Sequence, residues 1–271
     1  MSETQMAKLV PEHEKSYVDV TEVAGDDVSE EQIQRALQRY GWAAKYCKGK
    51  DVLELACGAG FGLGILVDVA ATLAAGDIDK CLVERAKATY GNAFPISVLD
   101  ATRLPFPDNY FDVVILFEAI YYIEEPDLFL SETRRVLRHG GHLLIATANK
   151  DLFDFAPSPY SVAYYNAVEL GRLVRSHGFQ PSYFVGFPIA RASFLQRALR
   201  PVKKLVVAFN LMPKTMAGKK LLKRLVFGRL RPMPADLRIV SLPTEEPEPW
   251  PEAPNTSHKV LYMAGRLIKN G

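Results

Sequence analysis

Short apolar runs alternate with longer stretches in which apolar residues recur at helical spacing along most of this chain. The apolar runs predict strands at residues 51–56, 72–77, 94–99, 111–117, 142–148 and 181–187, and a final strand at 259–267. The helical spacing predicts helices at residues 61–70, 80–90, 127–138 and 160–176. This alternation is typical of an α/β protein whose parallel strands carry helices on both faces of the sheet.

The N-terminal part and the segment before the last strand follow other patterns. Ser29 followed by Gln32 predicts a capping box, after which apolar residues continue at helical spacing. Between residues 188 and 257, apolar stripes lie among lysines and arginines and predict two amphipathic helices. We therefore divide the chain into an N-terminal helical cap (1–48), a core (49–187), a basic helical lid insertion (188–257) and a final core strand (258–271).

The composition, with 48% hydrophobic and 24% charged residues, is typical of a soluble globular protein. Cys47, Cys57 and Cys81 form no CxxC motif, and the five histidines lack ligand spacing. We therefore expect a reducing, cytoplasmic setting and no metal. The first twenty residues lack the apolar stretch of a signal peptide, and the apolar run 205–212 is too short to span a membrane.

The net charge of +2 conceals an uneven distribution. Residues 171–235 contain fourteen Lys and Arg, whereas all 31 acidic residues lie outside this segment. Such asymmetry indicates an anionic partner. Three interpretations stay open: a solvated face, peripheral contact with a membrane surface, or binding of an anionic acceptor.

The stretch DVLELACGAGFG, residues 51–62, is a predicted strand that runs into a glycine-rich turn and a helix start. In an open parallel sheet this turn lies at the carboxyl edge of the strands, where ligands bind. Glycines let the backbone approach a ligand, and the helix start attracts an anionic group; alternatively, the glycines serve only helix–sheet packing. The spacing departs from the dinucleotide fingerprint GxGxxG, because Leu63 stands where its third glycine would be.

Acidic residues end the next two predicted strands. Asp77 follows Gly58 by nineteen residues, and a carboxylate there can accept both hydroxyls of a ribose. Asp100 ends the third strand, where a carboxylate can accept an exocyclic amine. Each acid alone would fit a helix cap, but a glycine turn and two acids on successive strand ends are hard to explain as caps.

These motifs resemble those of the class I S-adenosylmethionine-dependent methyltransferases, over residues 49–187 and the last strand. The segments that carry the resemblance are VLELACGAG, GDID, DATRLPF, YFDVVILFEAIYYI and RVLRHGGHLLIAT. The resemblance implies a Rossmann-like, doubly wound, seven-stranded sheet with an antiparallel last strand. It also implies S-adenosyl-L-methionine as methyl donor and S-adenosyl-L-homocysteine as product.

The resemblance further implies that the cofactor contacts residues at four strand ends. The implied set comprises Glu54, Ala56, Gly58 and Gly60 along the methionine and ribose, Asp77 and Ile78 at the ribose, Asp100 and Ala101 at the adenine, and Phe117 and Glu118 beside the cofactor.

The reacting residues are less defined, because Tyr121 and Tyr122 stand where relatives often carry an acidic or histidine residue. This departure leaves the general base unassigned. We name Tyr121, Tyr122 and His13 as candidate catalytic residues, His13 because N-terminal segments close over the cofactor in similar enzymes. Aromatic residues suit a sugar face, an aromatic ring or a cationic amine, and we expect an acceptor pocket lined by Tyr17, Tyr121, Tyr160 and Tyr164.

The first interpretation is a methyltransferase that acts on a small-molecule acceptor by in-line methyl displacement. The acceptor would be a secondary metabolite or a sugar or glycan intermediate, anionic or linked to a carrier or lipid, and methylated on O, N or C. A second interpretation is a nucleic-acid methyltransferase that grips through residues 171–235, which the acidic body and the lack of an RNA-binding module disfavour. A third is a non-catalytic protein that keeps the cofactor as a structural ligand. The sequence does not indicate an oligomeric state.

Overall fold

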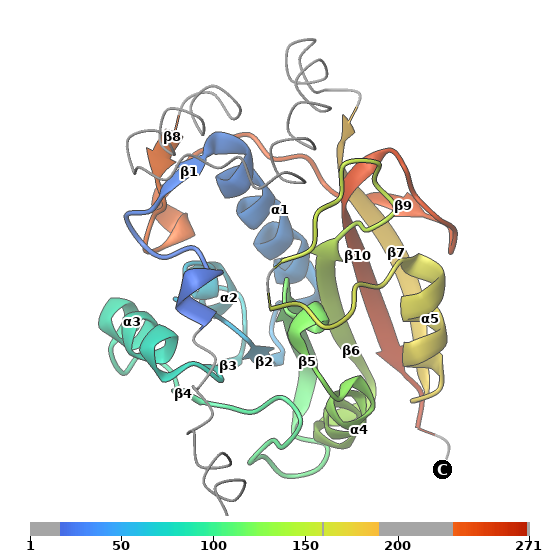
Figure 1. Cartoon of the computed structure of the whole chain (residues 1–271). Helices are drawn as coiled ribbons and strands as arrows, with labels where there is room; N and C mark the ends of the chain where they lie inside the picture. Colours follow the sequence, from blue (N-terminus) through green and yellow to red (C-terminus); the bar gives the residue numbers. More distant parts are fainter. Residues whose placement is uncertain (1–16, 159, 190–229, 270–271) are drawn as a thin grey trace, which may run out of the picture.

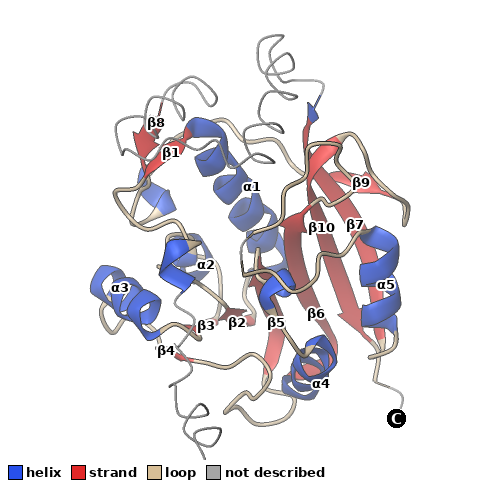
Figure 2. Cartoon of the chain, in the orientation of Figure 1, coloured by secondary structure: helices blue, strands red, loops and turns tan. Residues whose placement is uncertain are grey.

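The computed structural model describes residues 17–158, 160–189 and 230–269 of the 271-residue chain. It is a mixed α/β structure around one large sheet (Figures 1 and 2). The strands are β1 (Asp27–Ser29), β2 (Asp51–Leu55), β3 (Thr72–Asp77), β4 (Ile96–Val98), β5 (Phe111–Phe117), β6 (Leu137–Ala148), β7 (Phe179–Pro188), β8 (Leu230–Pro232), β9 (Glu248–Trp250) and β10 (His258–Leu267). The helices are α1 (Glu30–Cys47), α2 (Leu63–Val67), α3 (Lys80–Tyr90), α4 (Pro126–Val136) and α5 (Ala167–Arg175), with short 3-10 turns η2 (Tyr17–Asp19), η3 (Ile120–Tyr122) and η5 (Leu237–Ile239).

The central sheet has the strand order β4-β3-β2-β5-β6-β10-β7-β9. Strands β2 to β6 pair in parallel, and β10 pairs antiparallel with β6 and β7. The chain leaves β2 toward β3 and β4, then returns to place β5 on the other side of β2. Ligands of open α/β sheets bind at such a reversal, so the carboxyl ends of β2 and β5 are the expected site.

Helices cover both faces of the sheet because side chains alternate along each strand. On β5, Val113 and Ile115 face a core shared with α1, α2 and α3. Val114 and Leu116 face the opposite core, which includes residues of α4 and α5. The doubly wound architecture and the antiparallel last strand predicted from the sequence are thereby confirmed.

The predicted number of seven strands is wrong, because the described residues alone form a sheet of eight. The additional strand, β9, lies in the Pro/Glu-rich segment of the predicted insertion, and it pairs antiparallel with β7. It contains Pro249, which is tolerated because β9 is the last strand of the sheet.

Helix boundaries also differ from prediction. The helix expected at 160–176 begins only at Ala167, because Asn166 and Glu169 form a capping box there. The capping box predicted at Ser29 and Gln32 is confirmed at the start of α1.

In the predicted mainly helical insertion, residues 230–257 form β8, η5 and β9, with β8 paired to β1 in a separate small sheet. The two predicted amphipathic helices fall largely on residues 190–229, outside the described part.

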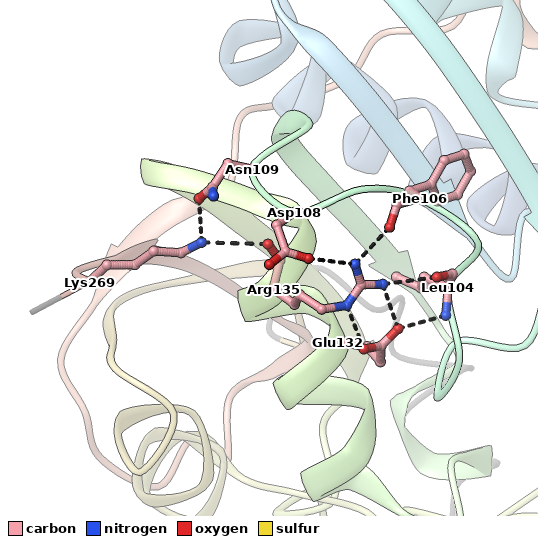
Figure 3. A network of polar contacts seen from close by, with 7 residues as sticks. All are labelled: Leu104, Phe106, Asp108, Asn109, Glu132, Arg135 and Lys269. Atoms are coloured by element: carbon pink, nitrogen blue, oxygen red, sulfur yellow. Dashed lines mark hydrogen bonds and ion pairs between the residues drawn. The ribbon is translucent and has the colours of Figure 1, made fainter. Parts of the chain in front are cut away.

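A polar network fastens the loop between β4 and β5 (Figure 3). The guanidinium of Arg135 on α4 donates to the carbonyl oxygens of Leu104 at 2.9 Å and Phe106 at 2.6 Å. It also pairs with Glu132 and Asp108. Because Glu132 in turn accepts the amide of Leu104 at 2.8 Å, α4 holds this loop through both backbone groups of one residue.

Replacing Arg135 with methionine is expected to lower the free energy of unfolding by about 1–2 kcal/mol, because loop carbonyls and Glu132 lose their charged partner. Urea denaturation measures the change. The control Lys87→Met, on the exposed side of α3, should stay within about 0.5 kcal/mol of wild type. An Arg135 variant that matches this control would show that the loop is held without the network.

Candidate active site

The carboxyl ends of β2 and β5 have a backbone conformation that is unfavourable for their residues. Ala56 and Glu118, the first residues after these two strands, have φ values of 53° and 49°. Non-glycine residues rarely adopt this left-handed conformation, which costs on the order of 1 kcal/mol or more. Such strain clusters at functional sites, and here it lies on both strands of the topological switch point.

The glycine-rich loop after β2 is required by conformation and by packing. Gly58 and Gly60 have φ values of 57° and 81°. A Cβ on Gly58 would lie 3.0 Å from Cγ2 of Thr21, and one on Gly60 would lie 2.9 Å from Cβ of Ala86 on α3. The packing alternative therefore accounts for part of the glycine pattern. It also shows that the N-terminal segment around Thr21 crosses over this loop.

Asp77, at the end of β3, binds the backbone of the glycine-rich loop that follows β2. Its Oδ2 accepts the amide of Gly58 and its Oδ1 accepts the amide of Asp79, both at 2.9 Å. Burial raises the pKa of Asp77, and these two amide bonds oppose that shift. A carboxylate has about four lone-pair sites, so Asp77 keeps capacity for a further donor such as a ribose hydroxyl. Next to it, Ile78 is 56% exposed, and Asp79 also accepts the amide of Tyr17 at 2.9 Å.

Glu54 is a buried acid of β2 that contacts α1. It is 1% exposed, and the hydroxyl of Tyr40 donates to its Oε1 at 2.6 Å. Its Oε2 has no hydrogen-bond partner within the described ranges. Burial raises the pKa of Glu54 to about 8, although the bond from Tyr40 and the charge of Arg39 act in the opposite direction. This carboxyl can therefore hold a proton or accept a further donor.

Glu118 is held from two sides. Arg39 on α1 pairs with its Oε1 at 2.7 Å, and the hydroxyl of Tyr121 donates to its Oε2 at 3.2 Å. Burial, followed by the charge of Glu118, raises the pKa of Tyr121 well above its ordinary value. Tyr121 is therefore a protonated donor at neutral pH. Phe117 is buried beside these groups and meets the ring of Tyr40 edge-on at 5.5 Å.

Asp100 and Ala101 lie in the turn after β4. Oδ1 of Asp100 accepts the amide of Thr102 at 2.8 Å and its hydroxyl at 2.7 Å. Asp100 is exposed and Ala101 is half-buried. The carboxylate thus shapes its own turn while staying accessible to a ligand.

The tyrosines predicted to line an acceptor pocket form one cluster of ring contacts. Tyr17 meets Tyr122 at 5.4 Å and Tyr160 at 6.4 Å between ring centroids. Tyr121 contacts Tyr122 at 4.5 Å and stacks on Tyr164 at 4.3 Å. The cluster joins η2, η3 and the loop before α5, and the hydroxyl of Tyr121 links it to Glu118.

One candidate catalytic residue cannot be placed in the site. His13 lies outside the described residues. Within the described ranges, no cluster of histidine, cysteine, aspartate and glutamate could hold a metal ion, and no helix is long and apolar enough to cross a membrane.

Two residues that sequence reasoning missed are Tyr40 and Arg39, which contact Glu54 and Glu118 from α1. Helical spacing places Tyr40 on the apolar side of its helix, but no sequence signal pairs either residue with a strand end.

Replacing Gly62 with alanine is expected to lower the free energy of unfolding by about 1–3 kcal/mol, because the new Cβ would overlap the ring of Tyr40. Gly41→Ala provides the matched control. Gly41 lies in α1, and no atom lies within 4 Å of the position that a Cβ would take there, so alanine should stabilise by about 0.5–1 kcal/mol. Thermal and urea unfolding should therefore give opposite signs for the two variants, and equal signs would contradict the packing argument.

Comparison with known proteins identifies the core of the chain. Residues 53–145 match the family model of a methyltransferase domain. A probable S-adenosylmethionine-dependent methyltransferase of Mycolicibacterium smegmatis is 36% identical over 145 residues, which cover 52% of this chain and 56% of that protein. Residues 53–145 are thus a methyltransferase domain, similar to S-adenosylmethionine-dependent methyltransferases. The cofactor that the family and fold imply is S-adenosyl-L-methionine.

Further relatives of this methyltransferase domain extend the comparison. The ubiquinone/menaquinone biosynthesis C-methyltransferase UbiE of Neisseria meningitidis is 33% identical over 115 residues, or 38% of this chain and 44% of that protein. A crystal structure of an S-adenosylmethionine-dependent methyltransferase from Thermotoga maritima aligns with a TM-score of 0.55 at 13% identity, over 87% of this chain and 92% of that one. This last likeness concerns the fold alone. The chain spans about half the length of the curated relatives it matches.

The residues at the sheet edge fit this cofactor. The capacity that remains on Asp77 suits a ribose hydroxyl. The exposed carboxylate of Asp100 suits an amine, and the unpartnered Oε2 of Glu54 within the described ranges suits a donor or a cation. These assignments remain predictions for each residue.

Proposed function

We propose that this chain is an S-adenosylmethionine-dependent methyltransferase whose acceptor is a small molecule bound against the tyrosine cluster. The observation that carries the proposal is the strained carboxyl edge. Ala56 and Glu118 both have positive φ there, at the switch point of a fold whose core matches a methyltransferase domain. Strain of this kind persists where function requires a defined backbone.

Methyl transfer requires that the acceptor be aligned with the methyl group more than that side chains activate it. When bound, the cofactor supplies a methyl group that its sulfonium already activates. The chain must hold the acceptor in line and exclude water, and correct positioning can contribute about 7–11 kcal/mol. The N-terminal segment supports this role, because Tyr17 reaches Asp79 and Thr21 lies against Gly58 at the same edge.

The tyrosine cluster favours acceptors that need no strong base. Burial raises the pKa of Tyr121, Tyr122 and Tyr164, so these phenols are protonated at neutral pH. An aliphatic alcohol must lose a proton to a base, whereas an amine that arrives neutral attacks directly. The Neisseria relative is named a C-methyltransferase, so a carbon acceptor is a further candidate, and the faces of an electron-rich ring suit tyrosines. We therefore propose an amine or an electron-rich ring as the acceptor class.

The decisive experiment has two stages. Calorimetry with S-adenosylmethionine and S-adenosylhomocysteine first tests binding. Incubation with methyl-labelled cofactor and a panel of amines, phenols, glycans and nucleic acids then tests transfer, with mass spectrometry to detect one added methyl group. Transfer to the small amines or rings would support the proposal. Transfer only to nucleic acid would favour a nucleic-acid methyltransferase, and binding without any transfer would favour a non-catalytic role.

A further inference from the structure

Arg39 lies on α1 and contacts the turn that joins β5 to η3. Its Nη1 pairs with Oε1 of Glu118 at 2.7 Å, and only 11% of its side chain is exposed. Its Nε has no hydrogen-bond partner among the described residues. Burial disfavours the charged guanidinium, but the Glu118 carboxylate raises the pKa of Arg39 above its ordinary value. The ion pair with Glu118 thus offsets the burial of this charge.

Glu118 has both carboxylate oxygens engaged by protein groups. Arg39 binds Oε1 and the hydroxyl of Tyr121 donates to Oε2. Its amide donates to the carbonyl of Ala146 on β6 at 2.8 Å, and its φ is 49°. Because a carboxylate has about four lone-pair sites and the Glu118 side chain is 28% exposed, both this carboxylate and the backbone of the turn can meet a ligand at this edge. A left-handed non-glycine residue persists only where its surroundings fix it.

We infer that Arg39 is a positioning residue that, through its ion pair, holds Glu118 in the left-handed conformation and so fixes the turn 117–120 for cofactor binding. This inference rests on the proposed function, because the ligand expected at this edge is the cofactor. Arg39 acts on that ligand through the backbone of Glu118. Since glycine adopts positive φ freely, a glycine at position 118 should no longer need Arg39.

The test combines Arg39→Met, Arg39→Lys, Glu118→Gly and the double variant Arg39→Met/Glu118→Gly. Calorimetry with S-adenosylhomocysteine as the probe measures Kd. Arg39→Met should raise Kd about tenfold, since one interaction with a charged group is worth about a factor of ten or more. Arg39→Lys should recover part of this loss. Glu118→Gly removes a residue predicted beside the cofactor, so its own Kd is the reference for the double variant. Adding Arg39→Met to Glu118→Gly should change Kd by less than about threefold, although each single change lowers thermal stability.

Arg35→Met is the matched control, one turn earlier on α1 and paired with Glu31. It should leave Kd unchanged. Hydrogen exchange of peptides covering residues 117–122 provides a measurement that needs no ligand, and Arg39→Met should accelerate exchange there while Arg35→Met does not. Unchanged exchange in Arg39→Met overturns the inference. So does an Arg39→Met defect in Kd that is equally large when measured in the Glu118→Gly background. The two proposals can fail separately. If the wild-type chain binds no cofactor, but Arg39→Met accelerates exchange over residues 117–122 and Arg35→Met does not, the proposed function is refuted while the positioning role of Arg39 is supported.

Discussion

Replacing Asp77 with alanine is expected to weaken S-adenosylmethionine binding by about 1.5–3 kcal/mol, or roughly 10- to 100-fold in Kd. Two effects act together. The ribose would lose a charged acceptor, and the amides of Gly58 and Asp79 would lose the carboxylate that both bind at 2.9 Å. Without that carboxylate the glycine loop is no longer fastened to the end of β3. Calorimetry on the folded variant measures the loss.

A matched control separates binding from stability. Asp112, near the amino end of β5, accepts the amide of Asp51 at 3.0 Å and pairs with Arg138 at 2.9 Å. Asp112→Ala therefore removes a similar set of contacts from the edge opposite to the predicted site. It should lower stability while cofactor affinity stays at the wild-type value. If both variants lose affinity in proportion to their loss of stability, Asp77 serves the fold and not the cofactor.

Much of the fold could be predicted from the sequence, for a physical reason. Strands such as β5 are buried on both faces and therefore form continuous apolar runs that stand out between amphipathic helices. The positions of the glycine turn and of Asp77 and Asp100 follow from the same pattern, because parallel strands present their carboxyl ends at one edge. The short strand β9 escaped detection, since three residues with a central proline give no strand signal.

Contacts between distant elements could not be predicted in this way. Arg39 and Glu118 are 79 positions apart, and helical spacing gives no information on which strand end a residue of α1 will reach. The pair of Tyr40 and Glu54 depends likewise on how α1 lies across the sheet. Left-handed φ at Ala56 and Glu118 is also invisible in the sequence, because neither residue type favours it. The positions of the candidate site residues at the strand ends could thus be predicted, whereas the groups that hold these residues in place could not.

The stability of the chain is expected to fall as pH rises from about 5 to 8, and replacing Glu54 with glutamine should remove much of that fall. Burial raises the pKa of Glu54 from 4.5 to about 8 in the folded chain. Between these values the folded state holds a proton that the unfolded state has released, so rising pH favours unfolding. At about 1.4 kcal/mol per pKa unit, the contribution is up to on the order of 5 kcal/mol.

Urea denaturation at several pH values between 5 and 9 tests this expectation. Glu54→Gln keeps the shape and an acceptor for Tyr40 but carries no charge, so the variant should be more stable than wild type at pH 8 and close to it at pH 5. A smaller slope should remain, because burial also raises the pKa of Asp77. Glu84→Gln, on the exposed side of α3, should keep the full wild-type slope. If Glu54→Gln keeps the full slope as well, Glu54 is ionised in the folded chain at neutral pH, and the raised pKa of this carboxyl is contradicted.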